Sequence, residues 1–491
     1  MKTILWTAEE AAQAVHALNA PAVEGWQATG ISIDTRSLQQ GDIFIALKGP
    51  NHDGHDHASA ALDAGAAGVI VSQLFEGVQQ DDPRIVMVED TTQALEDLGR
   101  VARHRATDTM VIGVTGSVGK TTVKTTLGTL LGMQARTTWP QGSLNNHFGV
   151  PLSLSRLPRD DRFAVFELGM NHAGELSTLT RQVQPHIAII TNIAAVHIEH
   201  FDGVEAIADA KAEILEGMGR DGTAILPRDN EHYPRLLAAA RTEGIGTIIS
   251  FGMHDKAEAR LVDYATRPDG GSQITADILG ETVSVAIPLR GEHQAINALA
   301  ILAAIKLAGG NLRQAASDYI HIKPVEGRGT RQGLTLQDGG RVTLVDEAYN
   351  ASPLSTSASL KVLGDDRSAR RRVAMLGDML ELGEHGPDLH AGLAAACDGV
   401  NVIHTAGPLM KNLHAALPET QRGQHFEDAS ALAASCSDLV AGGDTIMVKG
   451  SNGSRMKLVV EAVAGLDTKT DAPSGGTETH NAKHKAAQDV L

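Results

Sequence analysis

A glycine-rich turn between two apolar segments is the first part of the chain whose residues could do chemistry. Residues 111–131 read VIGVTGSVGKTTVKTTLGTLL, with the run Gly-Ser-Val-Gly-Lys-Thr at 116–121. The common phosphate-binding pattern is G-x-x-x-x-G-K-[ST], but the residue five positions before Gly119 is Val114. The loop is therefore shorter than the common one, and its neighbours must decide whether it binds a nucleotide.

Those neighbours place the loop between a strand and a helix. MVIGV, residues 110–114, is an apolar run typical of a buried strand. After the loop, apolar side chains recur at Val123, Leu127, Leu130 and Leu131, which is the spacing of a core-facing helix. The free N–H groups and the dipole at a helix N-terminus attract phosphate. A chance Gly-Lys-Thr in an ordinary turn would not have both neighbours, so the sequence predicts a nucleotide site.

Each residue type of the loop suits a phosphate ligand. Glycine lets the main chain approach the phosphate oxygens, Lys120 can reach the β- and γ-phosphates, and Thr121 can hold Mg²⁺. The predicted nucleotide-binding residues of the loop are Thr115, Gly116, Ser117, Val118, Gly119, Lys120, Thr121 and Thr122.

A second lysine stands where a helix would bury an apolar side chain. Residues 203–218 read GVEAIADAKAEILEGM. Apolar side chains recur with helical spacing at Val204, Ile207, Ile214 and Met218. Lys211 occupies the position where this stripe would have another apolar side chain. Lys211 is either a lysine that reaches solvent at a domain edge or a buried amine with a lowered pKa. In its neutral form such an amine can react with CO₂, and the resulting carbamate is an oxygen ligand for Mg²⁺.

Two predicted strands end in side chains that can bind a metal. RFAVFELGMN carries Glu167 at the end of an apolar run, and PHIAIITNIAAVHIEHF carries His197 after another. In open α/β sheets the ligand site lies outside the carboxyl ends of the strands. Each residue alone has an ordinary explanation as a helix cap or a surface charge. Beside the glycine-rich loop, however, we predict four metal ligands, namely Thr121, Glu167, His197 and Lys211.

Together these motifs resemble those of the Mur ligases, the ATP-dependent amide-forming enzymes of peptidoglycan synthesis. The resemblance runs from about residue 25 to about residue 465 and rests on TGSVGKTT, GSLNNHFGVPLSL, FELGMN, HIEHF and AKAEI. It implies that Lys120, Glu167, His197 and Lys211 are catalytic, and that Lys211 carries a carbamate. It also implies nucleotide contacts in GEHQAINALA, EGRG and VDEAYNASP, from Asn297, Arg328 and Asp346 respectively.

The resemblance further implies a set of substrate-binding residues. They are Thr35, Arg36, Ser37, Lys48, Asn145, Asn146, Tyr349, Asn350, Lys449 and Ser451. The first four lie in the segment DTRSLQQGDIFIALKGPNHDGHDH. Its final NHDGHDH is open to interpretation as a metal cluster, but we expect a polar substrate loop, because its histidines alternate with a flexible glycine.

Three departures from the family pattern affect the predicted site. Asp346 is followed by Glu347 where the family usually has a second aspartate, and IAAVHIEHFDG replaces a Gly-Pro-Ala-His run. Asn452 alters the loop KGSNGSRM. None of these changes removes a residue that the chemistry needs.

The order of predicted elements gives the fold class. Short β-rich runs alternate with helical patterns, which favours α/β domains with parallel sheets, and 491 residues correspond to about three domains. We expect a sugar-nucleotide-binding α/β module at 1–88, a P-loop parallel-sheet ATPase domain at 89–322 and a Rossmann-like ligase domain at 323–466. Residues 467–491 are polar and predict a disordered tail.

Composition excludes several classes of protein. The formal net charge of −17 argues against a general nucleic-acid binder. No uninterrupted apolar run reaches the ~18 residues of a membrane span, and the N-terminal segment MKTILWTAEEAAQAV lacks a secretory pattern. The two cysteines form no disulfide framework. We therefore expect a soluble cytoplasmic protein.

The resemblance implies one activity in particular. It implies a monomeric ligase that joins D-alanyl-D-alanine to UDP-N-acetylmuramoyl-tripeptide, using ATP and Mg²⁺, through an acyl phosphate. Another Mur-type step or a folylpolyglutamate-synthetase-like reaction remains an alternative. A P-loop GTPase switch would need an N-K-x-D motif, which the chain lacks. A purely regulatory nucleotide-binding protein would not need Lys211 in a core stripe.

Overall fold

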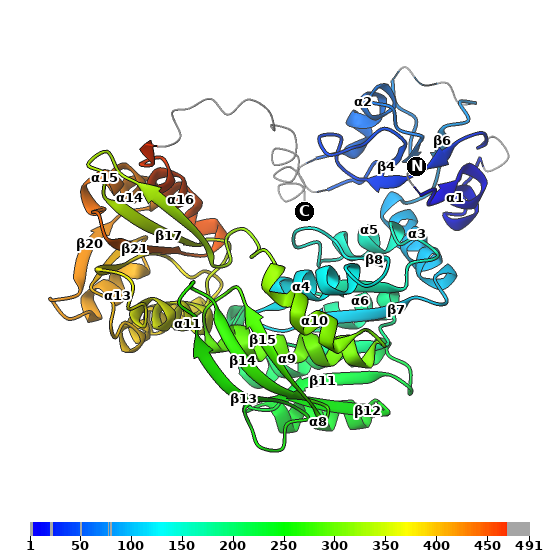
Figure 1. Cartoon of the computed structure of the whole chain (residues 1–491). Coiled ribbons are helices and arrows are strands. Elements are labelled where there is room, and N and C mark those ends of the chain that lie inside the picture. Colours follow the sequence, from blue (N-terminus) through cyan, green and yellow to red (C-terminus); the bar gives the residue numbers. More distant parts are fainter. Residues whose placement is uncertain (1–2, 20–22, 50–51, 77, 79–80, 469–491) are drawn as a thin grey trace.

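The computed structural model describes residues 3–19, 23–49, 52–76, 78 and 81–468. Within them the strands form sheets of four, nine and six strands and a two-stranded ribbon. Figure 1 shows three lobes in chain order, coloured blue, then cyan to green, then yellow to red. The predicted α/β class with parallel sheets is confirmed. From residue 469 onward, the predicted disordered tail lies outside the described residues.

The N-terminal lobe contains the parallel sheet with strand order β3-β4-β5-β6. Its strands are short apolar runs, such as the fully buried Gly68–Val71, so both faces must be covered. The elements of this lobe are β1 (Trp6–Thr7), α1 (Ala8–Ala14), β2 (Gln27–Ala28), β3 (Gly30–Ser32), β4 (Asp42–Ile45), η2 (Gly54–His57), α2 (Ala58–Asp63), β5 (Gly68–Val71), β6 (Ile85–Met87) and α3 (Thr91–Arg105).

The central lobe contains the nine-stranded sheet, ordered β15-β14-β13-β12-β11-β10-β7-β9-β8 among the described residues. Strands β8 to β13 are parallel to their neighbours, and β13, β14 and β15 continue the sheet as an antiparallel meander. Its elements are β7 (Met110–Thr115), α4 (Lys120–Gly132), β8 (Thr137–Thr138), α5 (Gly149–Ser155), β9 (Phe163–Glu167), α6 (Glu175–Val183), β10 (Ile187–Ile190), η3 (Ile198–His200), α7 (Val204–Ala212), η4 (Glu213–Gly217), β11 (Thr223–Pro227), α8 (Tyr233–Thr242), β12 (Thr247–Gly252), β13 (Ala259–Thr266), β14 (Ser272–Ile278), β15 (Glu281–Ile287), α9 (Glu292–Leu307), α10 (Leu312–Asp318) and η5 (Tyr319–His321).

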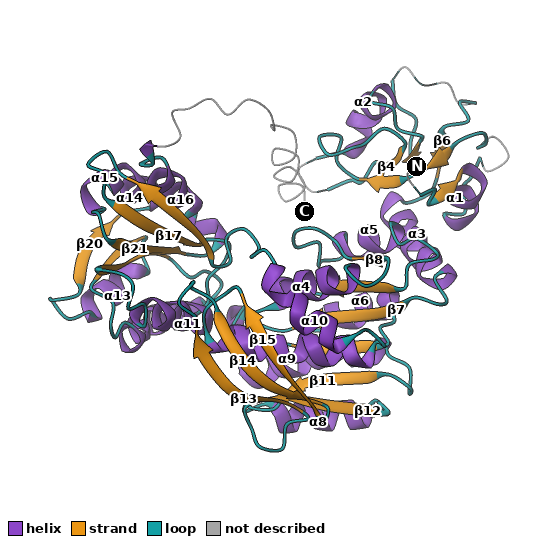
Figure 2. Cartoon of the chain, in the orientation of Figure 1, coloured by secondary structure: helices purple, strands orange, loops and turns teal. Residues whose placement is uncertain are grey.

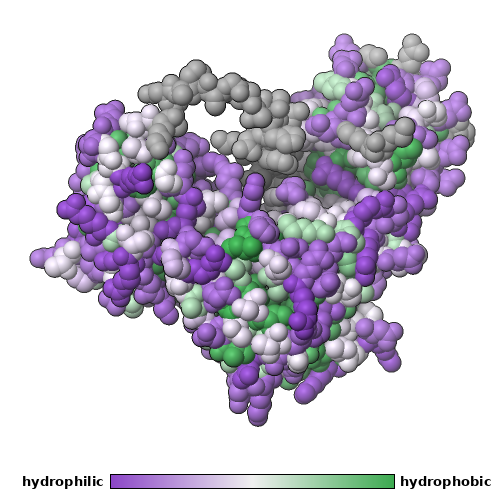
Figure 3. Space-filling view, viewed as in Figure 1, coloured by the Kyte–Doolittle hydropathy of each residue, from purple (hydrophilic) through white to green (hydrophobic). Residues whose placement is uncertain are grey.

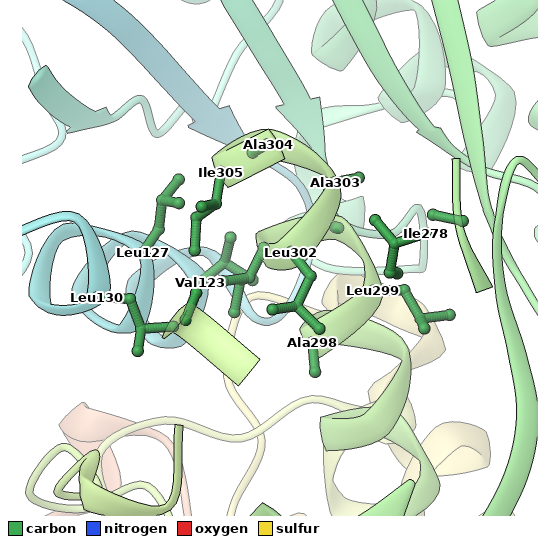
Figure 4. Close-up of a cluster of buried hydrophobic side chains, with 14 of the residues drawn as sticks. Val123, Leu127, Leu130, Ile278, Ala298, Leu299, Leu302, Ala303, Ala304 and Ile305 are labelled. Carbon is green, nitrogen blue, oxygen red and sulfur yellow. The ribbon is translucent and has the colours of Figure 1, made fainter. Parts of the chain in front are cut away.

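Helices cover both faces of this sheet (Figure 2). Helices α4, α9 and α10 pack on one face, and α5, α6, α7 and α8 pack on the other. Figure 4 shows the first layer, where Val123 and Leu127 of α4 lie beside Leu302 and Ile305 of α9. This packing fixes the N-terminus of α4, and therefore the glycine-rich loop, relative to the sheet.

The C-terminal lobe contains the six-stranded sheet, ordered β16-β17-β21-β18-β19-β20 among the described residues. All its pairings are parallel except that of β16 with β17. Its elements are β16 (Thr330–Thr335), β17 (Arg341–Glu347), α11 (Pro353–Gly364), β18 (Arg371–Gly377), η6 (Gly383–His385), α12 (Gly386–Gly392), η7 (Leu393–Ala396), β19 (Val402–Ala406), α13 (Met410–Ala416), β20 (Arg422–Phe426), α14 (Ala429–Ala434), α15 (Cys436–Leu439), β21 (Asp444–Lys449), η8 (Asn452–Ser454) and α16 (Lys457–Ala464).

Side chains of both lobes fasten the N-terminal lobe to the central lobe. The indole Nε1 of Trp6 donates to the carbonyl of Ser155 at 2.9 Å, and Arg156 Nε donates to the carbonyl of Ile31 at 2.8 Å. Leu152 of α5 completes the apolar core of the N-terminal lobe. These contacts join the two lobes through hydrogen bonds and a shared core.

An ion cluster joins the central lobe to the C-terminal lobe. Asp366, which is almost fully buried, lies between Arg290 of the central lobe and Arg331 of β16, with one N–O distance of 2.9 Å to each. Burial alone would raise the pKa of Asp366, but hydrogen bonds from Ser368, Arg331 and Arg290 hold it well below its ordinary value. The cluster therefore keeps a carboxylate ionised where the two lobes meet.

The surface is mainly polar. Figure 3 shows hydrophilic side chains over the outer surfaces of the lobes and hydrophobic ones in small separate patches. In the described ranges, none of the helices has the combination of length and apolar character that crossing a membrane requires.

The Asp366 cluster predicts a pH-dependent stability. Asp366→Asn leaves two guanidinium groups without their carboxylate, and removing one partner of a buried ion pair costs about 3–5 kcal/mol. Because the folded pKa is depressed, the stabilisation should be complete above the unfolded pKa of ~3.9 and lost as the pH falls below it. Urea unfolding of the variant and the wild type at pH 7 and near pH 3 measures both effects.

Asp365→Asn is the matched control, because Asp365 is adjacent and exposed. It should unfold like the wild type at both pH values. Equal stability of Asp366→Asn and the wild type at pH 7 would contradict a stabilising role for the cluster.

Candidate active site

The glycine-rich loop connects β7 directly to α4. Gly116 has a φ of 142° and Gly119 a φ of 88°, a region that favours glycine. A Cβ on Gly116 would lie 2.0 Å from Thr191 Oγ1, so only glycine fits there. Lys120, the first residue of α4, donates from Nζ to the carbonyl of Gly116 at 2.7 Å. The predicted strand–loop–helix arrangement is therefore present.

Two further predicted residues come from the strands that flank β7. Strand β9 ends at Glu167, and β10 leads to His197; both strands are parallel to β7, so their carboxyl ends lie at one edge. Glu167 is 2% exposed. Its Oε1 accepts from Asn145 Nδ2 at 2.8 Å, while its buried Oε2 has no hydrogen-bond partner among the described residues.

A cavity lies in front of this edge, between the central and C-terminal lobes. Its empty volume is about 2430 Å³, including the part that is open to solvent. The predicted residues that line it are Ser117, Val118, Gly119, Lys120, Thr121, Thr122, Asn145, Glu167, His197, Asn297, Arg328, Tyr349, Asn350, Lys449 and Ser451. The structure thus brings together residues that are far apart in the sequence, although their individual roles remain predictions.

Arg328 links the C-terminal side of this cavity to the glycine-rich loop. Its Nη2 donates to Thr121 Oγ1 at 3.0 Å, and its guanidinium lies 4.1 Å from the centre of the Tyr349 ring. Burial lowers the pKa of Lys120, and the charge of Arg328 lowers it further, whereas Glu167 opposes that shift. Two cations, Lys120 and Arg328, therefore lie beside the glycine-rich loop, and they suit an anionic ligand at that position.

The buried Lys449 forms a second cationic position in the C-terminal lobe. Its Nζ donates to the carbonyl of Asn350 at 3.0 Å and lies 3.4 Å from Glu347 Oε2. Burial lowers the pKa of this ammonium, and Glu347 partly offsets the shift.

His197 contacts the C-terminal lobe. Its Nδ1 forms an ion pair with Glu381, a residue of the loop after β18. The hydrogen bond from His197 lowers the pKa of Glu381, although burial opposes the shift. Both residues have positive φ values, 58° and 62°, although neither is glycine. The pair closes one side of the cavity across the two lobes.

Lys211 lies on α7 and is only 1% exposed. Its ammonium has no hydrogen bond or ion pair with any described residue. Burial lowers its pKa well below the ordinary value, and the charge of Lys120 lowers it further. The interpretation as a lysine that reaches solvent is therefore wrong. The single predicted helix over 203–218 is also partly wrong, because α7 ends at Ala212 and the 3₁₀ helix η4 follows.

Several predicted residues of the central and C-terminal lobes do not line the cavity. Thr115 donates its hydroxyl to the carbonyl of Leu168, and Asn146 Oδ1 accepts from the N–H groups at the start of α5. Asp346 accepts from Ala348 N at 2.9 Å, and burial raises its pKa. The remaining ones are Gly116 and Lys211, which are also outside the cavity lining.

The four predicted residues of the N-terminal lobe also lie outside this cavity. Thr35 and Ser37 belong to the turn after β3, where Arg36 donates to both carboxylate oxygens of Asp34. Lys48 lies 3.9 Å from Asp53 Oδ2. Their predicted contact with a sugar nucleotide remains a prediction.

The NHDGHDH segment is held by its own hydrogen bonds. Asp53 Oδ1 lies 2.5 Å from His55 Nδ1, and His55 Nε2 accepts from Ser72 N at 3.0 Å. Within the described ranges, which omit Asn51, no three acidic, histidine or cysteine side chains gather as a metal site. The structure therefore gives no support to a metal cluster in this segment.

Lys124 and Glu381 are two of the residues at or near the cavity that were not predicted. Lys124 is fully buried on α4, and the spacing that singled out Lys211 could have revealed it, because Lys124 precedes Leu127 by three residues and Leu131 by seven. Glu381 has no comparable local signal, since its partner His197 lies in another lobe.

Family models match most of the chain. Residues 27–103 match the Mur ligase family catalytic domain, 114–305 the Mur ligase middle domain, and 331–452 the Mur ligase glutamate ligase domain. These three segments correspond in order to the three lobes in Figure 1.

Several proteins of known name match this chain over nearly their whole length. The UDP-N-acetylmuramoyl-tripeptide--D-alanyl-D-alanine ligase of Rickettsia prowazekii is 32% identical, over 88% of this chain and 94% of that protein. The ligase of the same name from Synechocystis is 34% identical, over 88% and 90%. The crystal structure of MurF from Acinetobacter baumannii superposes with a TM-score of 0.81 at 27% identity, covering 94% of this chain and 99% of that one. The chain belongs to the Mur ligase family.

Proposed function

We propose that the chain is an ATP-dependent ligase that joins D-alanyl-D-alanine to UDP-N-acetylmuramoyl-tripeptide and forms the UDP-linked pentapeptide. The names of relatives at 32–34% identity support these substrates. The observation that carries the proposal is the cavity where the phosphate loop, Glu167 and Arg328 meet. Membership of a ligase family sets aside a GTPase switch and a regulatory nucleotide-binding protein.

ATP is assigned to the loop and its surroundings in the cavity. The N–H groups at the start of α4 and the Lys120 ammonium would hold the β- and γ-phosphates. The amide of Asn297 would lie 3.2 Å from a Cβ on Gly119, so Asn297 is next to the loop. We assign the adenine to the position beside Asn297. Arg328 reaches the loop from the other lobe. Nucleotide binding would therefore draw on both lobes.

The residues at the sheet edge fit Mg²⁺. The metal usually binds one or two carboxylates together with phosphate oxygens, and the buried Oε2 of Glu167 is without a hydrogen-bond partner among the described residues. Thr121 supplies a hydroxyl in the same cavity. When bound, Mg²⁺ would neutralise charge on the phosphates. His197 and a carbamate on Lys211 are the proposed ligands of a second ion.

The surroundings of Lys211 fit a carbamate. Lys211 is 1% exposed, and its ammonium has no hydrogen bond or ion pair with the described residues, so it is costly to keep charged. The neighbouring charge of Lys120 adds to this cost. Both effects favour the neutral amine, which is the form that reacts with CO₂. The product is an anion, so it would turn repulsion between Lys211 and Lys120 into attraction.

The proposed reaction has two steps. The γ-phosphoryl group of ATP passes to the carboxylate of the acceptor, and ADP leaves with the bridging oxygen. The amine of D-alanyl-D-alanine then attacks the acyl phosphate, loses a proton, and phosphate leaves from the tetrahedral intermediate. Lys120 and Arg328 stabilise the charge on the transferred group by position and electrostatics. Closure of the C-terminal lobe excludes water from the acyl phosphate.

The three lobes divide the substrates between them in this proposal. Residues 1–88 hold the sugar nucleotide, 89–322 bind ATP, and 323–466 bring the dipeptide; helix α3, just after the first boundary, also supplies Leu95 and Leu98 to the core of the N-terminal lobe. A cytoplasmic location follows from the need for ATP and a UDP-linked substrate. We propose that the protein acts as a monomer.

The first prediction of this function concerns coupling. Phosphate release from ATP should require both UDP-N-acetylmuramoyl-tripeptide and D-alanyl-D-alanine, because the site is complete only when both lobes hold their substrates. A phosphate-release assay with each substrate omitted in turn measures this. Rapid phosphate release from ATP alone, unchanged by either substrate, would contradict the assigned ligase function.

The second prediction concerns the phosphate loop. Lys120→Ala should lower kcat by about 100–1,000-fold, as the loss of one charge-stabilising donor does. The thermal unfolding midpoint should change little, because Lys120 bonds only to its own loop. Lys256→Ala, at an exposed position, is the control and should retain full activity. Activity of Lys120→Ala within a few-fold of the wild type would refute the loop assignment.

The third prediction concerns the carbamate. Lys211→Ala and Lys211→Arg should both be inactive, since neither side chain forms a carbamate, while binding of ADP to the loop should be retained. A short carboxylic acid in the buffer should partly restore turnover by Lys211→Ala, because a free carboxylate can occupy the vacated space. A fully active Lys211→Arg variant, together with no effect of added carboxylate, decides against the carbamate.

A further inference from the structure

Lys124 is the second lysine of helix α4 and is fully buried. It follows Lys120 by one helical turn, and its exposed fraction is 0%. Lysine is almost never fully buried unless it is paired. It does not line the cavity between the lobes, and its ammonium is bonded to groups of the protein itself. A buried ammonium directly behind a phosphate loop must therefore act through the protein groups that it contacts.

Those groups belong to the loop between β8 and α5. Lys124 Nζ donates to the carbonyl of Pro140 at 2.7 Å and to the carbonyl of Gly142 at 2.6 Å. Charge-assisted hydrogen bonds of this kind are stronger than neutral ones. The ammonium thereby fixes the main chain of residues 140–142 against the helix that begins at the phosphate loop.

The same loop orients the carboxylate of Glu167. Ser143 Oγ donates to Glu167 Oε1 at 3.2 Å, and Asn145 Nδ2 donates to the same oxygen at 2.8 Å. Asn145 Nδ2 also donates to Ser143 Oγ at 2.9 Å, so the two side chains hold each other. One oxygen of the carboxylate is thus occupied by the loop that Lys124 fixes.

The other oxygen of Glu167 is left available. Oε2 is buried and has no hydrogen-bond partner among the described residues. Lys124 Nζ lies 3.9 Å from it, which is beyond hydrogen-bond distance. The ammonium therefore faces Oε2 without occupying it, and Glu167 itself lines the cavity. A lysine that served only to neutralise Glu167 would be expected to bond to this oxygen directly.

We propose that Lys124 is a positioning residue, which fixes the 140–145 loop so that Glu167 Oε1 is held by the loop and Oε2 is presented to the magnesium–nucleotide complex. The proposal rests on the proposed function for the presence of that complex. It assigns no direct contact with the nucleotide to Lys124. Residues behind a metal ligand commonly change metal affinity or activity by about 10–100-fold when they are replaced.

Metal binding to Lys124→Met tests the proposal. Methionine keeps much of the side-chain volume but donates no hydrogen bond. Mn²⁺ binding in the presence of ADP, followed by electron paramagnetic resonance, should weaken by about 10-fold or more, and the Mg²⁺ concentration for half-maximal turnover should rise in parallel. Binding of a fluorescent ADP analogue without metal should stay within about 3-fold of the wild type, because the phosphate loop is unchanged.

Lys306→Met is the matched control. Lys306 of α9 also donates to two main-chain carbonyls, those of Ile278 and Leu279, and lies 3.4 Å from Glu281 Oε2, but it is remote from the cavity. Its replacement should cost a comparable pair of hydrogen bonds and leave Mn²⁺ affinity unchanged. A purely structural effect of Lys124 would appear as lower thermal stability alone, with Mn²⁺ affinity unchanged as in Lys306→Met.

Ser143→Ala provides a second, milder variant in case Lys124→Met does not fold. It removes one of the two donors to Glu167 Oε1, so Mn²⁺ affinity should fall several-fold in the same direction. Wild-type Mn²⁺ affinity in Lys124→Met, or in Ser143→Ala if that variant alone folds, overturns the proposal. Mn²⁺ binding with ADP needs no peptide substrate, so a wrong acceptor or dipeptide would fail in the phosphate-release assay and leave this measurement valid.

Discussion

A group of buried lysines beside the phosphate loop is the constraint on which the central lobe depends. Lys120, Lys124 and Lys211 come from two helices, yet they lie close to the same sheet edge, and burial lowers the pKa of each. Lys120 and Lys124 are stabilised by main-chain carbonyls, while Lys211 has no such partner among the described residues. A chain with a net charge of −17 can therefore still bind a polyphosphate, because the local charge decides.

The need for cations at the phosphate loop also explains why the C-terminal side of the cavity contributes to the site. Arg328 adds a further cation and lies between Gly327 and Gly329, whose φ values are 72° and 90°. A Cβ on Gly327 would lie 2.9 Å from the Cβ of Tyr349, so the linker can pass this close to β17 only with glycine. The linker between the lobes is thus shaped to carry an arginine to Thr121. Ion pairs at Asp366 and Glu381 also join the two lobes.

Local patterns made the fold class and the centre of the site predictable. A strand, a glycine turn and a helix are each encoded by neighbouring residues, and Glu167 is found because it ends an apolar run. Burial of Lys211 could be predicted from helical spacing, but the change to a 3₁₀ helix after Ala212 could not, since spacing alone does not distinguish the two helix types over one turn.

Positions that depend on contacts between distant segments could not be predicted in this way. The pair His197 and Glu381 and the cluster at Asp366 each join residues from different lobes. On β17, Asp346 and Glu347 are adjacent, and successive side chains of a strand point to opposite faces. The motif drew attention to Asp346, whereas Glu347 lines the cavity. A shift of one residue thus separates a position in the cavity lining from one outside it.

The attachment of the N-terminal lobe has a consequence for substrate length. Trp6 and Arg156 bond across the boundary, and Leu152 completes the neighbouring core, so hydrogen bonds and a shared core hold these two lobes together. In the proposed function the sugar nucleotide is anchored on one lobe and its terminal carboxylate must reach the loop on the other. The distance between the two sites then sets a minimum length for the acceptor. The carboxylate of an acceptor with a shorter peptide would not reach the γ-phosphate of ATP.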